Sequence, residues 1–278
     1  MRKLEYLETK VLLEGLKFPE GPRWHDDRLY FSDMRSCNVT AVDLDGNSEI
    51  ITEIPNRPSG LGWLPDGRLL IVSMENRRLL RLGPDGLTEI ADLSNLISFP
   101  INDMVVDKKG RAYIGNFGFD YLNNEPFAPA EMILVSPHGD TKIVADSMEF
   151  PNGMVITPDD KNLIVAETFG HRLTAFNILN DGSLTKRRVW ADLEPLPPDG
   201  ICLDVEGAIW VATPNYGRAI RVLEGGEITH IVKINTEAFA CMLGGPDRDI
   251  LFICTSTKER INGRIEYVKV NVPGAGLP

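Results

Sequence analysis

Short apolar runs, each followed by a polar turn, recur along the whole chain of 278 residues. In one repeat, the apolar runs Leu69–Ser73 and 78–82 are bounded by the turns 65–68 and 84–86, which contain Asp-Gly. Asp-Gly between two apolar runs is a strong signal of a β-hairpin. The equivalents of the first run are continuously apolar, which suits strands covered on both faces: 29–32, 112–115, 163–166, 209–212 and 251–254. The pattern predicts an all-β protein.

A turn motif marks the start of each repeat and gives the period. Aligned on this turn, one position, here called the column, reads Glu20, Ser59, Asn102, Asn152, Asp199 and Ala240, at spacings of 39, 43, 50, 47 and 41 residues. Periods of about 40 to 50 residues with four short strands each are typical of propeller blades. The sequence therefore predicts one domain, residues 1–278, folded as a six-bladed β-propeller.

The ends of such a ring must meet, because an open first or last blade would expose strand edges. The run 10–14 has no place in the first repeat. We expect this N-terminal strand to complete the last blade beside residues 264–270.

Residues 118–130 form an insertion that is longer than the matching segments and rich in aromatic residues and prolines. A long loop with bulky side chains in a compact domain often covers a binding site. We expect a lid here; the alternative is a packed loop without a function.

Four column residues carry side-chain oxygens that suit a hard cation. On the innermost strands of a propeller, Glu20, Asn102, Asn152 and Asp199 would converge on the axis. Two carboxylates and two amide carbonyls favour Ca²⁺ or Mg²⁺, with Mn²⁺, Zn²⁺ and Fe²⁺ as further candidates. Asn or Asp before Gly is also common in plain turns, but that alternative does not explain Glu20. Three of the four, Glu20, Asn152 and Asp199, precede a glycine, and we expect these glycines to permit the backbone angles that aim the preceding side chains.

Composition excludes some classes of function. A net charge of −11, from 29 basic and 40 acidic residues, argues against a nucleic-acid partner. No stretch resembles a membrane span or a signal peptide, so we expect no membrane partner and a cytoplasmic location. The oligomeric state stays open. Four cysteines without CxxC spacing are expected to be reduced, with Cys202 near Cys241.

Three motifs resemble those of the gluconolactonase/regucalcin (SMP-30/gluconolactonase/LRE-like) family: Phe18-Pro19-Glu20-Gly21-Pro22, Pro151-Asn152-Gly153 and Pro198-Asp199-Gly200-Ile201. The resemblance covers essentially the whole chain. It implies a six-bladed propeller with one divalent ion, Ca²⁺ first among the candidates, and lactone hydrolysis as the commonest activity. It also implies that Glu20, Asn152 and Asp199 are metal ligands, that Asp199 is the general base, and that Asn102 contacts the substrate or the ion.

The chain departs from the family pattern at one informative place. Sugar-lactone members carry an arginine two residues before the Asn102 position, where this chain has Pro100. The missing arginine favours a lactone or ester that is less polar than a sugar lactone. We expect Asn102, Asp103, Phe119 and Tyr121 to bind this small molecule.

The hypothesis that follows is a metal-dependent lactonase in which Asp199 takes a proton from the attacking water. No GxSxG, P-loop or HExxH motif supports another mechanism. Three alternatives stay open: a phosphotriesterase or fluorophosphatase on the same site, a non-catalytic binding propeller with a structural ion, and recruitment to an isomerisation or dehydration.

Overall fold

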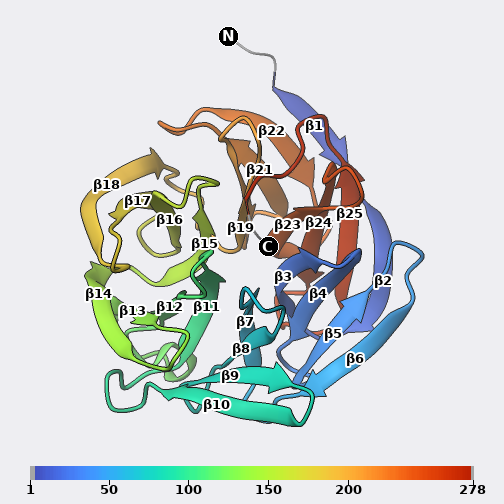
Figure 1. Cartoon of the computed structure of the whole chain (residues 1–278). Helices are drawn as coiled ribbons and strands as arrows, with labels where there is room; N and C mark the ends of the chain where they lie inside the picture. The colour runs from blue at the N-terminus through green and yellow to red at the C-terminus, as the bar shows by residue number, and fades with distance from the viewer. Residues whose placement is uncertain (1–3, 277–278) are drawn as a thin grey trace.

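Six β-sheets surround one central axis in the computed structural model, which describes residues 4–276 (Figure 1). We number the sheets as blades 1 to 6 in chain order, and the connected strands within each repeat are antiparallel. The first strand of each blade contacts the first strand of the next, and that of blade 6 contacts that of blade 1. The six-bladed propeller expected from the repeats is therefore confirmed.

The strands of the first three blades follow the hairpin pattern of the sequence. Blade 1 consists of β3 (Pro19–His25), β4 (Arg28–Asp33), β5 (Asn38–Val42) and β6 (Ser48–Glu53). Blade 2 consists of β7 (Pro58–Trp63), β8 (Leu69–Ser73), β9 (Arg78–Gly83) and β10 (Gly86–Asp92). Blade 3 consists of β11 (Ile101–Val106), β12 (Ala112–Asn116), β13 (Ala130–Val135) and β14 (Thr141–Met148), with the 3₁₀ helix η1 (Tyr121–Asn123) between β12 and β13.

The last three blades repeat the arrangement, and two of them receive an N-terminal strand. Blade 4 consists of β15 (Pro151–Ile156), β16 (Asn162–Glu167), β17 (Arg172–Ile178) and β18 (Leu184–Asp192). Blade 5 consists of β19 (Ile201–Leu203), β20 (Ile209–Thr213), β21 (Arg218–Val222), β22 (Ile228–Lys233) and β1 (Glu5–Glu8). Blade 6 consists of β23 (Glu237–Gly244), β24 (Ile250–Ser256), β25 (Gly263–Lys269) and β2 (Lys10–Leu16).

The ring closes as predicted, because β2 pairs antiparallel with β25 and places Lys10 opposite Tyr267. The pairing of β1 is an addition that the sequence did not indicate: this strand lies parallel to β22, as the outer edge of blade 5. The N-terminal segment thereby ties blade 5 to blade 6 (Figure 1).

The second strand of every blade supplies the core between blades. All five residues of β8, β12 and β20 are buried, and the other second strands are buried except at their first residue. Where the ring closes, the Trp24 ring stacks on Phe252 at 5.4 Å between centroids. This burial agrees with the continuous apolar runs of the sequence, which predicted strands covered on both faces.

Glycines near the axis serve mainly close packing. Gly21 has a positive φ of 55°, as the sequence argument expects, whereas Gly153 and Gly200 do not. A Cβ on Gly153 would lie 2.6 Å from the Ile201 nitrogen, and one on Gly200 would lie 2.5 Å from the Ala240 Cα. At these two positions the expected reason was wrong: the neighbouring inner strands approach too closely for a side chain.

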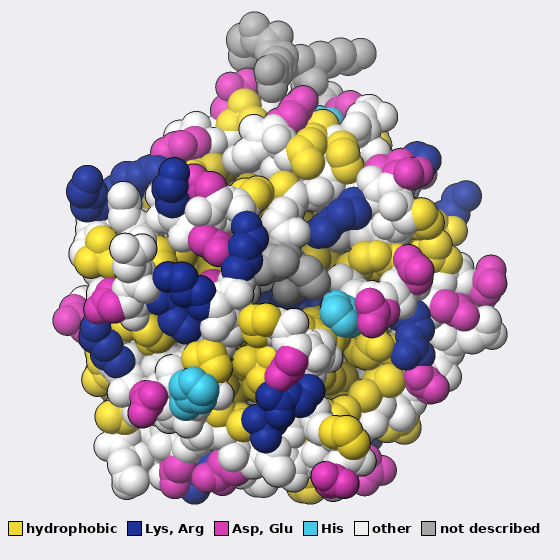
Figure 2. All heavy atoms as spheres, in the orientation of Figure 1, with side chains coloured by type: hydrophobic (Ala, Val, Ile, Leu, Met, Phe, Trp, Pro, Cys, Tyr) yellow, Lys and Arg dark blue, Asp and Glu magenta, His cyan; other side chains and the backbone are white. Residues whose placement is uncertain are grey.

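Two further observations concern the surface and the thiols. On the face shown in Figure 2, acidic and basic side chains are interspersed. The only helix in residues 4–276 has three residues, so no helix in this part of the chain is long and apolar enough to cross a membrane. The four cysteines are free, and the Cys202 and Cys241 sulfurs lie 4.0 Å apart, as expected from their places in neighbouring repeats.

Candidate functional site

The four column residues with cation-binding oxygens line one cavity of about 440 Å³. Glu20 lies on β3, Asn102 on β11 and Asn152 on β15, while Asp199 lies two residues before β19. The pairing of β3, β11 and β15 with their neighbours shifts register at this point. A bulge of this kind re-aims a side chain out of the regular alternation, and here it accompanies side chains that reach the cavity.

Loops between the second and third strands of the blades form the rim of the cavity. Five of the six blades contribute, through Met34 and Arg35, Phe117 and Tyr121, Thr168 and Phe169, Pro214 and Asn215, and Lys258, Glu259 and Arg260. The cavity therefore has a polar floor from inner strands and a rim of aromatic and cationic side chains.

Asp199 is held by its backbone, while one oxygen of its carboxylate has no hydrogen-bond partner in the described part of the chain. Its nitrogen donates to the Ala212 carbonyl at 3.0 Å. The side chain is buried, and its Oδ1 has no hydrogen-bond partner among residues 4–276. Burial raises the pKa of Asp199 to about 8, against the opposing charge of Arg260. A buried carboxylate oxygen without a donor is costly unless something else compensates it.

Glu20 shares this environment. Its Oε2 accepts one hydrogen bond, from the Gly21 nitrogen at 3.2 Å. Burial raises the pKa of Glu20 well above its ordinary value, and the charges of Asp199 and Asp103 raise it further. The half-buried Glu20 and the buried Asp199 carboxylates repel each other, and either a proton or a cation stabilises such a pair.

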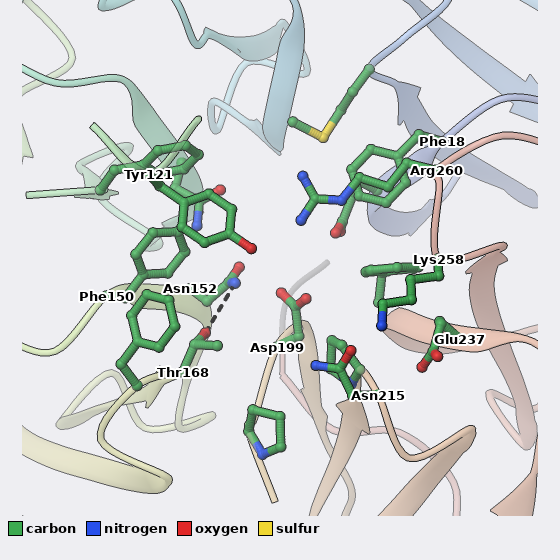
Figure 3. Close-up of a pocket in the computed structure, with 18 of the residues that line it drawn as sticks. Phe18, Tyr121, Phe150, Asn152, Thr168, Asp199, Asn215, Glu237, Lys258 and Arg260 are labelled. Atoms are coloured by element: carbon green, nitrogen blue, oxygen red, sulfur yellow. Dashed lines mark hydrogen bonds between the residues drawn. The ribbon is translucent and has the colours of Figure 1, made fainter. Parts of the chain in front are cut away.

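The amide nitrogens of the two asparagines are both engaged, that of Asn102 with the next blade and that of Asn152 within its own blade. Asn102 Nδ2 donates to the Pro151 carbonyl at 3.3 Å, and Asn152 Nδ2 donates to Thr168 Oγ1 at 3.2 Å. Thr168 in turn donates to the Pro198 carbonyl at 2.8 Å. Figure 3 shows the Asn152–Thr168 bond beside Asp199, at the cavity. With the nitrogens engaged, the amide oxygens remain as acceptors.

This donor set fits a hard divalent cation. It offers carboxylate oxygens from Glu20 and Asp199 and amide oxygens from Asn152 and Asn102, the ligand types that Ca²⁺ and Mg²⁺ prefer. The unpartnered Asp199 oxygen is the observation that supports the fit. No group of three or more His, Cys, Asp or Glu side chains in residues 4–276 is arranged for a metal. An ion here would depend on the asparagines to complete its coordination.

The other predicted residues fall in different places. Ser59 and Ala240, the remaining column members, are buried and do not line the cavity. Asp103 does not line it either: its Oδ1 accepts a hydrogen bond from Arg23 Nη2 at 2.9 Å, and burial raises its pKa against that charge. Tyr121 lines the cavity, as expected.

The insertion contributes less than a lid would. At its base, Asn116 accepts from the Gly118 nitrogen at 2.8 Å and donates to the Glu131 carbonyl at 2.8 Å. Phe119 is buried in the core and does not line the cavity, and Phe127 is 49% exposed. Of the aromatic side chains within 118–130, only Tyr121 lines the cavity.

Sequence reasoning missed the cationic side of the rim. Lys258 and Arg260 follow β24 in the last repeat, at the place where Phe117 follows β12. The signal was present in the repeat itself, because equivalent loops of a propeller meet at the same end. Only the loop of blade 3 was predicted to take part in binding, because it is longer than the equivalent loops.

Comparison with known proteins now places the chain. The family model described as "SMP-30/Gluconolactonase/LRE-like region" matches residues 18–257. The chain belongs to this family. The match includes all four column residues of the cavity floor and ends just before the rim residues Lys258 to Arg260.

Individual relatives of the family agree in extent and fold. Regucalcin of Danio rerio is 27% identical over 261 residues, which cover 88% of this chain and 85% of that protein. A solved calcium-binding protein, regucalcin from Agrobacterium tumefaciens strain C58, has a TM-score of 0.84 at 20% identity, with 99% of each chain covered. A gluconolactonase from Xanthomonas campestris has a TM-score of 0.75 at 22% identity, covering 93% of this chain and 89% of that one.

Proposed function

We propose that this protein is a divalent-metal-dependent lactonase. The observation that carries the proposal is the convergence of Glu20, Asn152 and Asp199 on one cavity, with a buried Asp199 oxygen that no donor within residues 4–276 satisfies. Family membership adds the reaction class, because the solved relatives include a gluconolactonase.

Glu20, Asn152 and Asp199 would hold the ion, with Asn102 beside them. When bound, such an ion supplies Lewis-acid chemistry at a carbonyl oxygen and stabilises negative charge there. We assign Ca²⁺ first, since the ligands are all oxygens and a related propeller is described as calcium-binding.

Asp199 is the proposed general base. Its carboxylate faces the cavity and can accept the proton of a water that attacks the lactone carbonyl carbon. Ring opening then needs a proton on the leaving alkoxide oxygen, which the protonated Asp199 can return. The bond from the Asp199 nitrogen to the Ala212 carbonyl holds the backbone that carries this carboxylate.

The walls of the cavity support a substrate with apolar surface. Phe117, Tyr121, Phe150 and Phe169 all line it, and the Phe150 and Phe169 ring centroids lie 5.0 Å apart. Aromatic walls suit an apolar ring better than a polyhydroxylated one. We therefore propose a lactone less polar than a sugar lactone.

A substrate panel tests the proposed function. Purified protein is stripped with EDTA, reloaded with Ca²⁺, Mg²⁺, Mn²⁺, Zn²⁺ or Fe²⁺, and assayed on aliphatic, aromatic and sugar lactones and on phosphotriesters. We expect turnover of lactones only in the reloaded protein, and a loss of about a hundredfold or more in Asp199→Asn. Turnover of phosphotriesters alone, or of no ester with any metal, would reject the lactonase proposal.

A further inference from the structure

The rim of the cavity carries an arginine whose charge has no partner close by. Arg260 lies in the loop between β24 and β25 and lines the cavity. Among residues 4–276 its guanidinium makes no hydrogen bond and no ion pair within 4.0 Å. Arg260 shares the rim of the cavity with two other cations, Arg35 and Lys258.

The loop that carries Arg260 is braced rather than loose. Arg260 adopts a positive φ of 58°, and its nitrogen donates to the Thr257 carbonyl at 2.8 Å. Thr257 Oγ1 donates to the Ile261 carbonyl at 2.8 Å, and Arg35 Nη1 donates to the Glu259 carbonyl at 2.7 Å. These bonds fix the backbone from which the Arg260 side chain projects.

Two aromatic rings hold the guanidinium over the cavity. The Arg260 Cζ lies 5.0 Å from the Phe18 ring centroid and 5.9 Å from the Tyr121 centroid, within the range of cation–π attraction. Figure 3 shows Arg260 pointing between Tyr121 and Asp199, toward the middle of the cavity. Contacts with ring faces leave the N–H groups of the planar fork available to an acceptor.

Charge balance indicates what that acceptor is. The cavity is lined by four carboxylates, of Glu20, Asp199, Glu237 and Glu259, and by three cations, of Arg35, Lys258 and Arg260. A divalent ion on the two inner carboxylates changes this balance from one negative charge in excess to one positive charge in excess. The loaded cavity therefore favours a ligand with one negative charge, and a guanidinium fork favours a carboxylate.

We propose that the substrate is a lactone that carries a free carboxylate on an apolar or aromatic frame, with Arg260 as the residue that selects the carboxylate. The lactone ring lies toward Asp199, the frame packs on Tyr121 and Phe150, and the carboxylate pairs with Arg260. This inference rests on the proposed function for the reaction, but the selection of an anion is a separate property of the same cavity.

Matched lactones test the proposal. A carboxylate-bearing dihydrocoumarin and its methyl ester are compared at pH 7.5 with Ca²⁺ present. In the parent protein we expect kcat/KM for the acid to exceed that for the ester by about tenfold to a hundredfold. Arg260→Gln should reduce this ratio to about one, and Arg260→Lys should leave an intermediate ratio because the charge remains without the fork.

Arg264→Gln is the matched control. Arg264 lies on the same hairpin and pairs with Glu14 at 3.3 Å, and it does not line the cavity. We expect this variant to keep the parent ratio. A parent ratio near one, or a ratio that Arg260→Gln leaves unchanged, would overturn the assignment of Arg260 even if both lactones are hydrolysed.

A binding measurement separates this inference from the lactonase proposal. Calorimetry compares 3-phenylpropionate with 3-phenylpropionamide on the Ca²⁺-loaded parent, Arg260→Gln and Arg264→Gln. If no lactone is hydrolysed but the acid binds at least tenfold better than the amide in an Arg260-dependent way, the anion site stands and the lactonase proposal fails. Equal binding of both probes, without hydrolysis, would reject both.

Discussion

Arg23 of blade 1 pairs with Asp103 of blade 3 through an Nη2–Oδ1 hydrogen bond of 2.9 Å, although 80 residues separate them in the chain. Both side chains are buried, and the same Arg23 nitrogen also donates to the Met104 carbonyl at 2.6 Å. The pair joins two blades next to the floor of the cavity, and its carboxylate raises the pKa of Glu20 and Asp199. It is a support of the site rather than part of its lining.

Removal of the Asp103 charge should therefore act on stability. Asp103→Asn leaves the Arg23 guanidinium buried without a counter-charge, and loss of one partner of a buried pair costs about 3 kcal/mol or more. Urea unfolding measures the change. Asp66→Asn is the control, because Asp66 pairs with Arg68 on the surface and its loss should change the midpoint little. A stable Asp103→Asn with a raised KM would instead indicate a direct contact with substrate.

The close approach of the inner strands gives a second prediction. Gly200→Ala would place a Cβ against Ala240 and the Phe239 carbonyl, so the inner strands must separate. We expect a loss of about 1 to 3 kcal/mol of unfolding free energy and weaker Ca²⁺ binding through Asp199. Gly83→Ala is the control, since its Cβ would meet only the Gly86 oxygen at 3.9 Å. Equal stability of the two variants would contradict this packing account.

Much of the fold could be predicted because the same pattern of strands and turns recurs in each repeat. Six turns in register gave the blades, and the surplus strand before Phe18 gave the closure. The pairing of β1 with β22 was not predictable, since nothing in a four-residue strand of mostly exposed residues specifies a parallel partner.

The site residues likewise fall into those that the repeat predicted and those that it did not. Glu20, Asn102, Asn152 and Asp199 were predicted together because equivalent positions of a propeller share one height, and all four line the cavity. Asp103 was predicted to bind substrate only because it follows Asn102 in the sequence. Adjacent strand residues point to opposite sides, and its partner Arg23 lies too far away in sequence to suggest a pair. Arg260 was missed because a Lys-Glu-Arg run is typical of a solvated turn.

The raised pKa values of Asp199 and Glu20 give a third prediction, for the metal-free protein. A carboxyl whose folded pKa is raised binds its proton more tightly in the folded state than in the unfolded state. Its contribution to stability is fully present below the unfolded pKa, near 4, and is lost as pH rises through the folded pKa, about 8 for Asp199. In EDTA, the melting temperature should fall over this window.

Ca²⁺ should reverse this loss, so the thermal shift that it produces should grow from pH 6 to pH 8. The double variant Glu20→Gln with Asp199→Asn removes both titrations and should show a flatter pH profile in EDTA and little Ca²⁺ shift. Scanning calorimetry measures each quantity. A Ca²⁺ shift of equal size in the parent and the double variant would show that the ion binds elsewhere.

The central claim is that Glu20, Asn152 and Asp199 share one divalent ion. A crystal structure of the protein grown with Ca²⁺, with Mn²⁺ substituted for anomalous scattering, tests it most directly. We predict one anomalous peak in the cavity, with oxygens of all three side chains about 2.0 to 2.6 Å from the ion. An occupied ion held by other residues, or a cavity without a peak at saturating metal, would contradict the account.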